Sequence, residues 1–175
     1  IFLRKTVNNI IDTIGYTAGG VYLKNEDKKT ANLVYSKNIS KELFGKIKNA
    51  DITKEPYSVV FEDKEVLTIC NYDKKNPDNS DVCDFKSVIS IPIESGNNVV
   101  GALNFAKSKN VPFTESEKDL LKIIGSEIGN FVKTIKYDQQ LEEKIDELKR
   151  WKKVTVGREL QMKELKKKIK ELENK

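Results

Sequence analysis

The stretch SVISIPIESGNNVVGALNFAKSKNVPFTESEKDLLKIIGSEIGNFV, residues 87–132, contains the local patterns that decide the fold. It begins with two apolar segments, SVISIPI and NVVGALNFAKS, which are separated by the residues ESGN at 94–97. Glycine and asparagine adopt positive φ most easily, so this short segment is typical of a turn. We therefore predict a β-hairpin that is central to a sheet. Pro92 has no amide hydrogen, so we expect it near a strand end or where no ladder bond is needed.

A long helix is predicted after the hairpin. Thr114 and Glu117 have the spacing of a capping box, in which each side chain bonds the other residue's backbone amide. Apolar residues then recur at helical spacing, namely Leu120, Leu121, Ile124, Ile128, Val132 and Ile135. From there to Lys175 the chain has no proline and one glycine, Gly157. We expect the helix to continue, or nearly so, to the end of the sequence.

The C-terminal segment has a heptad pattern with a break in it. Two groups of apolar residues are spaced by four and three, namely Leu141, Ile145 and Leu148, and Leu165, Ile169 and Leu172. The two groups start 24 residues apart, which is three heptads plus three, so their frames disagree. We predict a coiled coil with a discontinuity around Gly157, or a helical hairpin there.

The N-terminal part alternates between helical and strand patterns. An amphipathic helix is predicted over residues 1–14 and ends at Gly15. The segment GGVYLKNEDKKTANLVYS at 19–36 predicts a hairpin whose apolar residues share one face, namely Val21, Leu23, Leu33 and Tyr35. Ser40 is a candidate cap for the next helix, a further short helix is predicted from Pro56, and the strand EVLTI follows at 65–69.

Composition limits the class of protein. The chain has 175 residues and a net charge of +5, which suits one domain with its own core plus an extension. Its lysines lie among glutamates and its three arginines are scattered, so we expect a solvated surface and no nucleic acid. No run of about 18 apolar residues is present, so we expect no membrane insertion.

Two further features concern the setting of the chain. Cys70 and Cys83 are its only cysteines, which does not suggest a disulfide framework, so we expect free thiols in the cytoplasm. The chain opens with Ile1 and its single methionine is Met162, so we expect a piece of a longer protein whose flanking domains are missing.

The order of these elements resembles a GAF domain over residues 1–136, most specifically over 87–135. The matching features are the strand ending at Pro92, the turn, the strand with Gly101 and the helix start PFT. The resemblance implies an α+β fold with a mostly antiparallel central sheet. It further implies flanking helices that form a homodimer bundle on one face and a small-molecule pocket on the other.

The tail resembles the linkers of microbial sensor proteins, which join PAS or GAF domains to histidine kinases or other output modules. The segment that carries this resemblance is LKRWKKVTVGRELQMKELKKKIKELE, residues 148–173. We therefore predict a GAF sensor domain at 1–136 and a coiled-coil signalling linker at 137–175. The output domain would belong to the same longer chain.

Several known GAF ligands are disfavoured by the residues present. In the cyclic-nucleotide pattern of the family, Phe105 replaces the expected lysine and Lys118 the final glutamate, although Asn104, Phe113 and Glu117 fit loosely. The chain has no histidine, so it offers no usual haem ligand and no histidine-kinase phosphoacceptor. A bilin could attach to a cysteine, but the other chromophore-site residues are not recognisable. Two cysteines are only half of a tetrahedral Cys₄ metal site.

The resemblance to the GAF family also suggests an enzymatic function. Free methionine-R-sulfoxide reductases are GAF enzymes, and one of their motifs is similar to Cys83, Asp84, Ser87 and Pro92. Cys83 would attack the sulfoxide as a thiolate and Cys70 would resolve it as a disulfide. The second motif of those enzymes, a Gly and Cys pair at a helix start, is replaced here by PYSVVFEDKEV. We therefore expect a non-catalytic domain.

Candidate ligand-binding residues surround the polar loop between the two cysteines. They are Tyr57, Phe61, Cys70, Tyr72, Cys83, Phe85, Ser87 and Asn104. We expect the loop to cover the pocket and to carry a redox-sensitive thiol, and a Cys70–Cys83 bridge would order it. The sequence does not identify the ligand or any cofactor. In an alternative interpretation the pocket is filled by its own side chains, and the domain is an empty dimerisation spacer.

Overall fold

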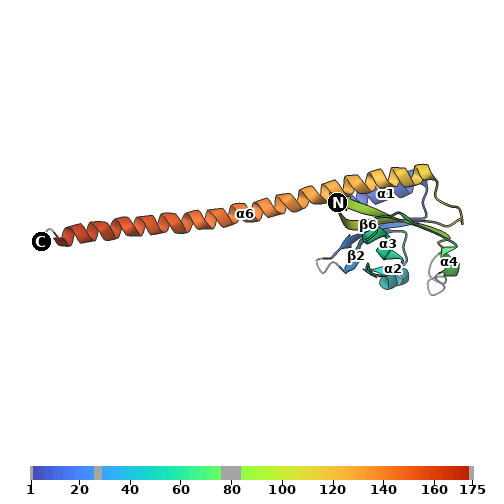
Figure 1. Ribbon diagram of the computed structural model, residues 1–175, viewed down its shortest axis with the longest axis horizontal. Coiled ribbons are helices and arrows are strands. Elements are labelled where there is room, and N and C mark those ends of the chain that lie inside the picture. Colours follow the sequence, from blue (N-terminus) through green and yellow to red (C-terminus); the bar gives the residue numbers. More distant parts are fainter. Residues whose placement is uncertain (1, 26–28, 76–83, 174–175) are drawn as a thin grey trace. The chain divides into compact units, whose positions relative to one another are not determined.

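A computed structural model describes residues 2–25, 29–75 and 84–173. The chain divides into two compact units, Ile1–Val132 and Lys133–Lys175. The first unit contains α1 (Phe2–Ile14), β1 (Ala18–Lys24), β2 (Thr30–Lys37), α2 (Lys41–Ile47), β3 (Asn49–Asp51), α3 (Tyr57–Phe61), β4 (Leu67–Cys70), α4 (Tyr72–Lys75), β5 (Ser87–Ser95) and β6 (Asn98–Lys107). Helix α6 (Glu115–Glu173) begins in the first unit and continues through the second (Figure 1).

The strands form one sheet in the order β3-β2-β1-β6-β5-β4, and each neighbouring pair is antiparallel. The predicted central hairpin is confirmed as β5 and β6, which join through Gly96 and Asn97. Gly96 has φ of 63°, the conformation that the first residue of a type II′ turn requires. Pro92 lies beyond the part of β5 that pairs with β4, where only β6 accompanies the strand. The predicted α+β fold with a mostly antiparallel sheet is confirmed.

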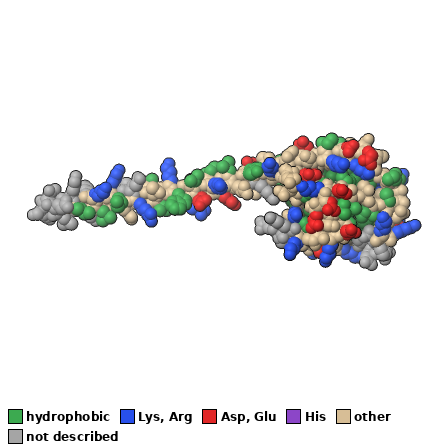
Figure 2. Space-filling view, in the orientation of Figure 1, with side chains coloured by type: hydrophobic (Ala, Val, Ile, Leu, Met, Phe, Trp, Pro, Cys, Tyr) green, Lys and Arg blue, Asp and Glu red, His purple; other side chains and the backbone are tan. Residues whose placement is uncertain are grey.

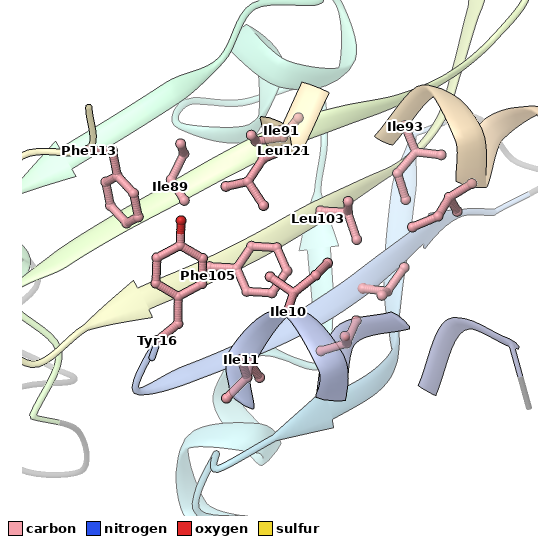
Figure 3. Close-up of a cluster of buried hydrophobic side chains, with 13 residues drawn as sticks. Ile10, Ile11, Tyr16, Ile89, Ile91, Ile93, Leu103, Phe105, Phe113 and Leu121 are labelled. Atoms are coloured by element: carbon pink, nitrogen blue, oxygen red, sulfur yellow. The ribbon is translucent and has the colours of Figure 1, made fainter. Parts of the chain in front are cut away.

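One face of the sheet packs against α1 and the first part of α6 (Figure 1). Figure 3 shows this cluster, in which alternate residues of β5 point toward the two helices. Its buried members are Val7, Ile10, Ile11, Tyr16, Val21, Ile89, Ile91, Ile93, Leu103, Phe105, Phe113, Leu121 and Ile128. The apolar spacing that predicts α1 corresponds to its buried side. Among the residues that predict α6, four pack in this cluster, whereas Leu120 and Ile135 are exposed.

A second, smaller cluster lies on the opposite face, which α2 and α3 cover (Figure 1). Its buried members are Tyr22, Ala31, Leu33, Ala50, Ile52, Val60, Phe61, Val99 and Ala102. Both faces of the sheet are thus covered, and the two layers of helices come from different parts of the chain.

The first hairpin departs from its prediction at Leu33. Its register shifts between Val21, which pairs with Tyr35, and Tyr22, which pairs with Leu33. Val34 is therefore an extra residue in β2, and such a bulge moves the residues on its two sides out of simple alternation. Tyr35 packs with Val21 on the α1 face, whereas Leu33 belongs to the α2 and α3 face. The prediction that all four apolar residues share one face is wrong for Leu33.

The predicted helix ends are confirmed by their hydrogen bonds. The backbone amide of Gly15 donates to the oxygen of Ile11, and Gly15 has φ of 82°, as a helix end requires. The hydroxyl of Ser40 accepts from the amide of Leu43 at the start of α2, at 3.1 Å. In the capping box of α6, the Thr114 amide donates to Glu117 Oε2 at 2.8 Å and the Glu117 amide to Thr114 Oγ1 at 3.2 Å.

Helix α6 runs without interruption through Gly157, so the alternative of a helical hairpin there is wrong. Within the second unit the apolar side chains are exposed, and Figure 2 shows them on its surface. The exposed set comprises Ile135, Tyr137, Leu141, Ile145, Leu148, Trp151, Val154, Val156, Met162, Leu165 and Ile169. These apolar side chains remain exposed among the described residues, so tertiary packing does not stabilise this part of the helix.

Candidate functional site

A cavity of about 230 Å³ lies on the α2 and α3 face of the sheet. Strands β1, β4, β5 and β6 form its floor, and residues of α2, α3 and α4 contribute to its walls. The wall residues include Leu43 and Ile47 from α2, Tyr57 from α3 and Tyr72 from α4. The described part of the cavity therefore combines segments that are distant in sequence.

The floor is hollow because the strands carry small side chains on this face. Ala18 and Gly20 of β1 lie beside Ala106 and Asn104 of β6 in the antiparallel register. A Cβ atom at Gly20 would lie only 2.8 Å from Leu33 Cδ1, so a larger residue there would push into the wall. The cavity therefore depends on the absence of bulk at these positions.

A polar pair lies on the apolar floor. Ser90 of β5 and Asn104 of β6 are directly opposite each other, and Ser90 Oγ donates to Asn104 Oδ1 at 2.7 Å. Ser90 is almost fully buried, whereas Asn104 is half-buried. This bond leaves the Asn104 side-chain nitrogen, a double donor, with no acceptor among the described residues.

Tyrosines form one wall. The hydroxyl of Tyr22 donates to the backbone oxygen of Ile47 at 2.7 Å, and its ring centroid lies 5.6 Å from that of Tyr57 with the planes inclined by 50°. Burial, and in addition the nearby Tyr57 and Tyr72, raise the pKa of Tyr22 well above its ordinary value. Burial also raises the pKa of Tyr57. Both phenols are therefore neutral at physiological pH and act as hydrogen-bonding aromatic surfaces.

Half of the candidate ligand-binding residues lie around the cavity. Tyr57, Tyr72, Phe85 and Asn104 line it. That these four bind a ligand stays a prediction, because the position of a side chain does not identify a bound molecule.

The other candidate residues lie elsewhere or outside the described residues. Phe61 is buried in the cluster around Tyr22. Cys70 is half-buried at the end of β4 and pairs with Ser87 of β5. Strand alternation places Ser87 with Ile89 on the α1 face, where it is fully buried and its hydroxyl has no partner among the described residues. Cys83 and most of the loop that precedes it lie outside the described residues, as does any bridge to Cys70.

Sequence reasoning missed Tyr22, Ser90 and the small residues of the floor. One signal was available, because the even-numbered residues of β5 up to Pro92 and of β6 from Ala102 share the face of Asn104. That alternation would have selected Ser90, Ala102 and Ala106. The contribution of Ala18 and Gly20 depends on the pairing of β1 with β6, which has no local signal in the sequence.

A second polar cluster connects β6 to the start of α6. Lys107 Nζ lies 2.8 Å from Glu117 Oε1 and 4.2 Å from the ring centroid of Phe113. Tyr16 donates a longer bond of 3.3 Å to the same carboxylate. Burial acts to raise the pKa of Glu117, but bonds from Lys107 and the Thr114 backbone outweigh it, so this pKa lies below its usual value. The strand that carries Asn104 thus also holds the first turn of α6.

A family model described as GAF domain matches residues 1–133. The chain belongs to the GAF domain family. This finding confirms the resemblance over the first unit, and GAF domains are sensory or regulatory domains. No curated protein matches the chain in sequence.

Solved structures share the fold at low sequence identity. The GAF domain of a phosphoenolpyruvate-protein phosphotransferase from Coxiella burnetii has a TM-score of 0.68 and 14% identity, covering 79% of this chain and 84% of that one. A domain from Sinorhizobium meliloti, described as part of a two-component sensor histidine kinase, has a TM-score of 0.64 and 13% identity, covering 79% and 93%. A free methionine-R-sulfoxide reductase from Neisseria meningitidis, solved with its substrate, has a TM-score of 0.61 and 15% identity, covering 73% of each chain.

Two kinds of feature are absent from the described residues of this GAF chain. No helix there is long and apolar enough to cross a membrane. No group of three or more His, Cys, Asp or Glu side chains in the described part is arranged to hold a metal ion.

Proposed function

We propose that this chain is a non-catalytic sensor whose GAF domain, residues 1–136, binds a small molecule and relays its presence through a coiled-coil linker, residues 137–175. The output domain would lie in the same longer protein, and a histidine kinase is one suitable class. The cytoplasm is the proposed location, which the low cysteine content supports.

One observation carries the proposal, namely that a single sheet connects the cavity to the C-terminal helix. Strand β6 contributes Asn104 and Ala106 to the cavity. The next residue, Lys107, is paired with Glu117 in the first turn of α6. A ligand that shifts β6 would therefore bias how α6 packs, and two alternative helix packings are the kind of change that a coiled coil transmits.

Dimerisation is the second part of the proposal. Within the first unit, Phe2, Leu120, Ile123 and Phe131 are exposed large apolar residues of α1 and α6. The rings of Phe2 and Phe131 lie 4.1 Å apart, so the two helices share one apolar surface. A second copy of the chain would cover this surface and, in the second unit, the heptad residues.

The proposal is tested by native mass spectrometry of the 175-residue chain, with and without reductant. A dimer that carries a small-molecule mass supports a ligand sensor and identifies the class of ligand. A dimer without a bound molecule whose subunits lose two hydrogens on oxidation would favour thiol sensing over ligand binding. A bare, unresponsive dimer would support the empty-spacer alternative, and a monomer would contradict the dimeric relay.

The alternative of a reductase is tested directly by an enzyme assay, because solved free methionine-R-sulfoxide reductases share this fold. Purified chain is assayed for reduction of free methionine-R-sulfoxide, and the Cys83→Ser variant serves as the comparison. We expect no activity in either. Turnover that Cys83→Ser abolishes would instead establish an enzyme.

A further inference from the structure

The geometry points to an uncharged, planar aromatic molecule of one or two rings, carrying a hydrogen-bond acceptor, as the ligand of the cavity. This inference rests on the proposed function, because it presupposes that the cavity binds a small molecule. It adds the chemical class, which follows from the size, charge, aromatic walls and polar floor of the described part.

The volume of the described part of the cavity favours a small ligand. The cavity of about 230 Å³ is smaller than the roughly 300–1,000 Å³ of most ligand pockets. It is larger than the engineered cavity of about 150 Å³ that binds benzene. A single substituted ring or a small bicyclic molecule fits within this volume, whereas a nucleotide or a tetrapyrrole would extend beyond it.

Charge favours a neutral molecule. None of the described lining residues is an aspartate or a glutamate, so nothing described there would neutralise a cationic ligand. Lys46 is the only charged side chain among them, and it is exposed and already has an interaction within the chain. The phenols of Tyr22 and Tyr57 are neutral. An ionised ligand would lose its hydration without gaining a dedicated partner.

Aromatic walls favour a planar ligand. Tyr22, Tyr57, Tyr72 and Phe85 all line the cavity. Tyr22 and Tyr57 already contact each other at 5.6 Å in a tilted arrangement, the geometry in which aromatic rings attract. A flat ring completes such a cluster with more ring-to-ring contact than a puckered ring of the same volume.

The polar pair on the floor of the cavity indicates that the ligand carries a hydrogen-bond acceptor. Ser90 uses its hydroxyl hydrogen on Asn104 Oδ1, and the Asn104 side-chain nitrogen has no acceptor among the described residues. An amide nitrogen donates and does not accept. A ligand carbonyl or ring nitrogen that reaches Asn104 would satisfy this donor, and an apolar ligand would leave it without a partner.

Three matched probes test this inference by two-dimensional NMR of the full chain. Benzamide is planar and uncharged and has a carbonyl acceptor. Benzoate replaces the amide with a charge, and cyclohexanecarboxamide keeps the amide but removes the planar ring. We expect benzamide to bind at least about tenfold more tightly than either of the others, and the side-chain amide signals of Asn104 to shift on titration.

Substitution of Asn104 tests the donor. Asn104→Asp keeps an acceptor for Ser90 but removes the side-chain N–H groups, and Asn104→Leu removes both. We expect either variant to bind benzamide about 3- to 10-fold more weakly, the usual loss for one neutral hydrogen bond. Asn98 is exposed at the start of the same strand and does not line the cavity, so Asn98→Asp and Asn98→Leu are matched controls. We expect the controls to bind as the unmodified chain does.

The outcomes separate the ligand class from the proposed function. If benzoate or cyclohexanecarboxamide binds as tightly as benzamide and shifts the signals of cavity residues, the neutral aromatic class is overturned. The proposal of a small-molecule sensor would remain. Equal benzamide affinity in the Asn104 and Asn98 variants would overturn the role of the donor. Failure of all three probes would overturn the class, and the native mass spectrum would then decide separately whether any small molecule is bound.

Discussion

The carbonyl group of Glu94, in β5, lies directly against the backbone of Gly129 in α6, and a methyl group at Gly129 would overlap it. One turn earlier in α6, a methyl group at Gly125 would lie 2.8 Å from the carbonyl oxygen of Pro92. The helix therefore rests on the strand at two positions that have no side chain. Only glycine permits this close approach.

Gly129→Ala should destabilise the fold, because the added methyl group forces α6 away from β5. We expect a loss of roughly 1–3 kcal/mol in the free energy of unfolding, as for other overpacked cores. This loss should exceed the gain of about 1 kcal/mol that alanine brings to a helix interior. Urea unfolding followed by circular dichroism measures it. Gly157→Ala is the control, since a methyl group there contacts nothing within 4 Å. Equal effects of the two substitutions would contradict the close approach of α6 to β5 at Gly129.

Glu117→Gln should remove the ion pair with Lys107 and make stability less dependent on pH. The folded-state pKa of Glu117 is lowered, so its ionised form stabilises the fold above its ordinary pKa of 4.5, and this contribution is lost as pH falls through the folded pKa. At pH 7 we expect the variant to be less stable by about 1 kcal/mol, since the pair is partly exposed.

The pH dependence of Glu117→Gln is measured by urea unfolding at several pH values between 7 and 3. The difference from the unmodified chain should shrink below the ordinary pKa of 4.5. Glu115→Gln is the matched control in the same turn, because Glu115 is largely exposed and its interactions with Lys118 and Lys122 are local to the helix. A difference for Glu117→Gln that stays constant down to acidic pH would show that the carboxylate charge is not responsible.

Tyr22→Phe should destabilise the cavity wall, because the Ile47 carbonyl loses the donor that lies 2.7 Å away. We expect a cost of about 1–2 kcal/mol for leaving a buried acceptor without its partner. Thermal and urea unfolding measure the change. Tyr137→Phe removes a hydroxyl from an exposed tyrosine and should have no effect. If Tyr22→Phe leaves the free energy of unfolding unchanged, water replaces the lost donor.

Deletion of residues 154–156 should strengthen the proposed coiled coil. It shortens the interval between Leu141 and Leu165 from 24 to 21 residues, which is three unbroken heptads. We expect a higher melting temperature of the helical signal and tighter dimerisation by analytical ultracentrifugation. In the intact protein we expect the output to be held in one state. Signalling that remains fully responsive would argue against the phase break as the relay.

Local sequence patterns determined the elements that their own residues stabilise. The turn at Gly96, the cap at Ser40 and the capping box of Thr114 and Glu117 each depend on atoms a few residues apart. Such signals are local, so they can be read before the fold is known. The order of these elements was also sufficient to indicate the GAF family.

Tertiary structure alone decided the face of Leu33 and the existence of the cavity. The bulge at Val34 follows from how β2 pairs with β1, and the hollow floor follows from how Ala18 and Gly20 lie beside Asn104. The first depends on the register within a hairpin, and the second depends on pairing between strands that are far apart in sequence, and the alternation of apolar residues encodes neither. The sequence by itself therefore determined the two hairpins, the family and the helices other than α4. Long-range strand register decided which side chains meet, and hence where a ligand would bind.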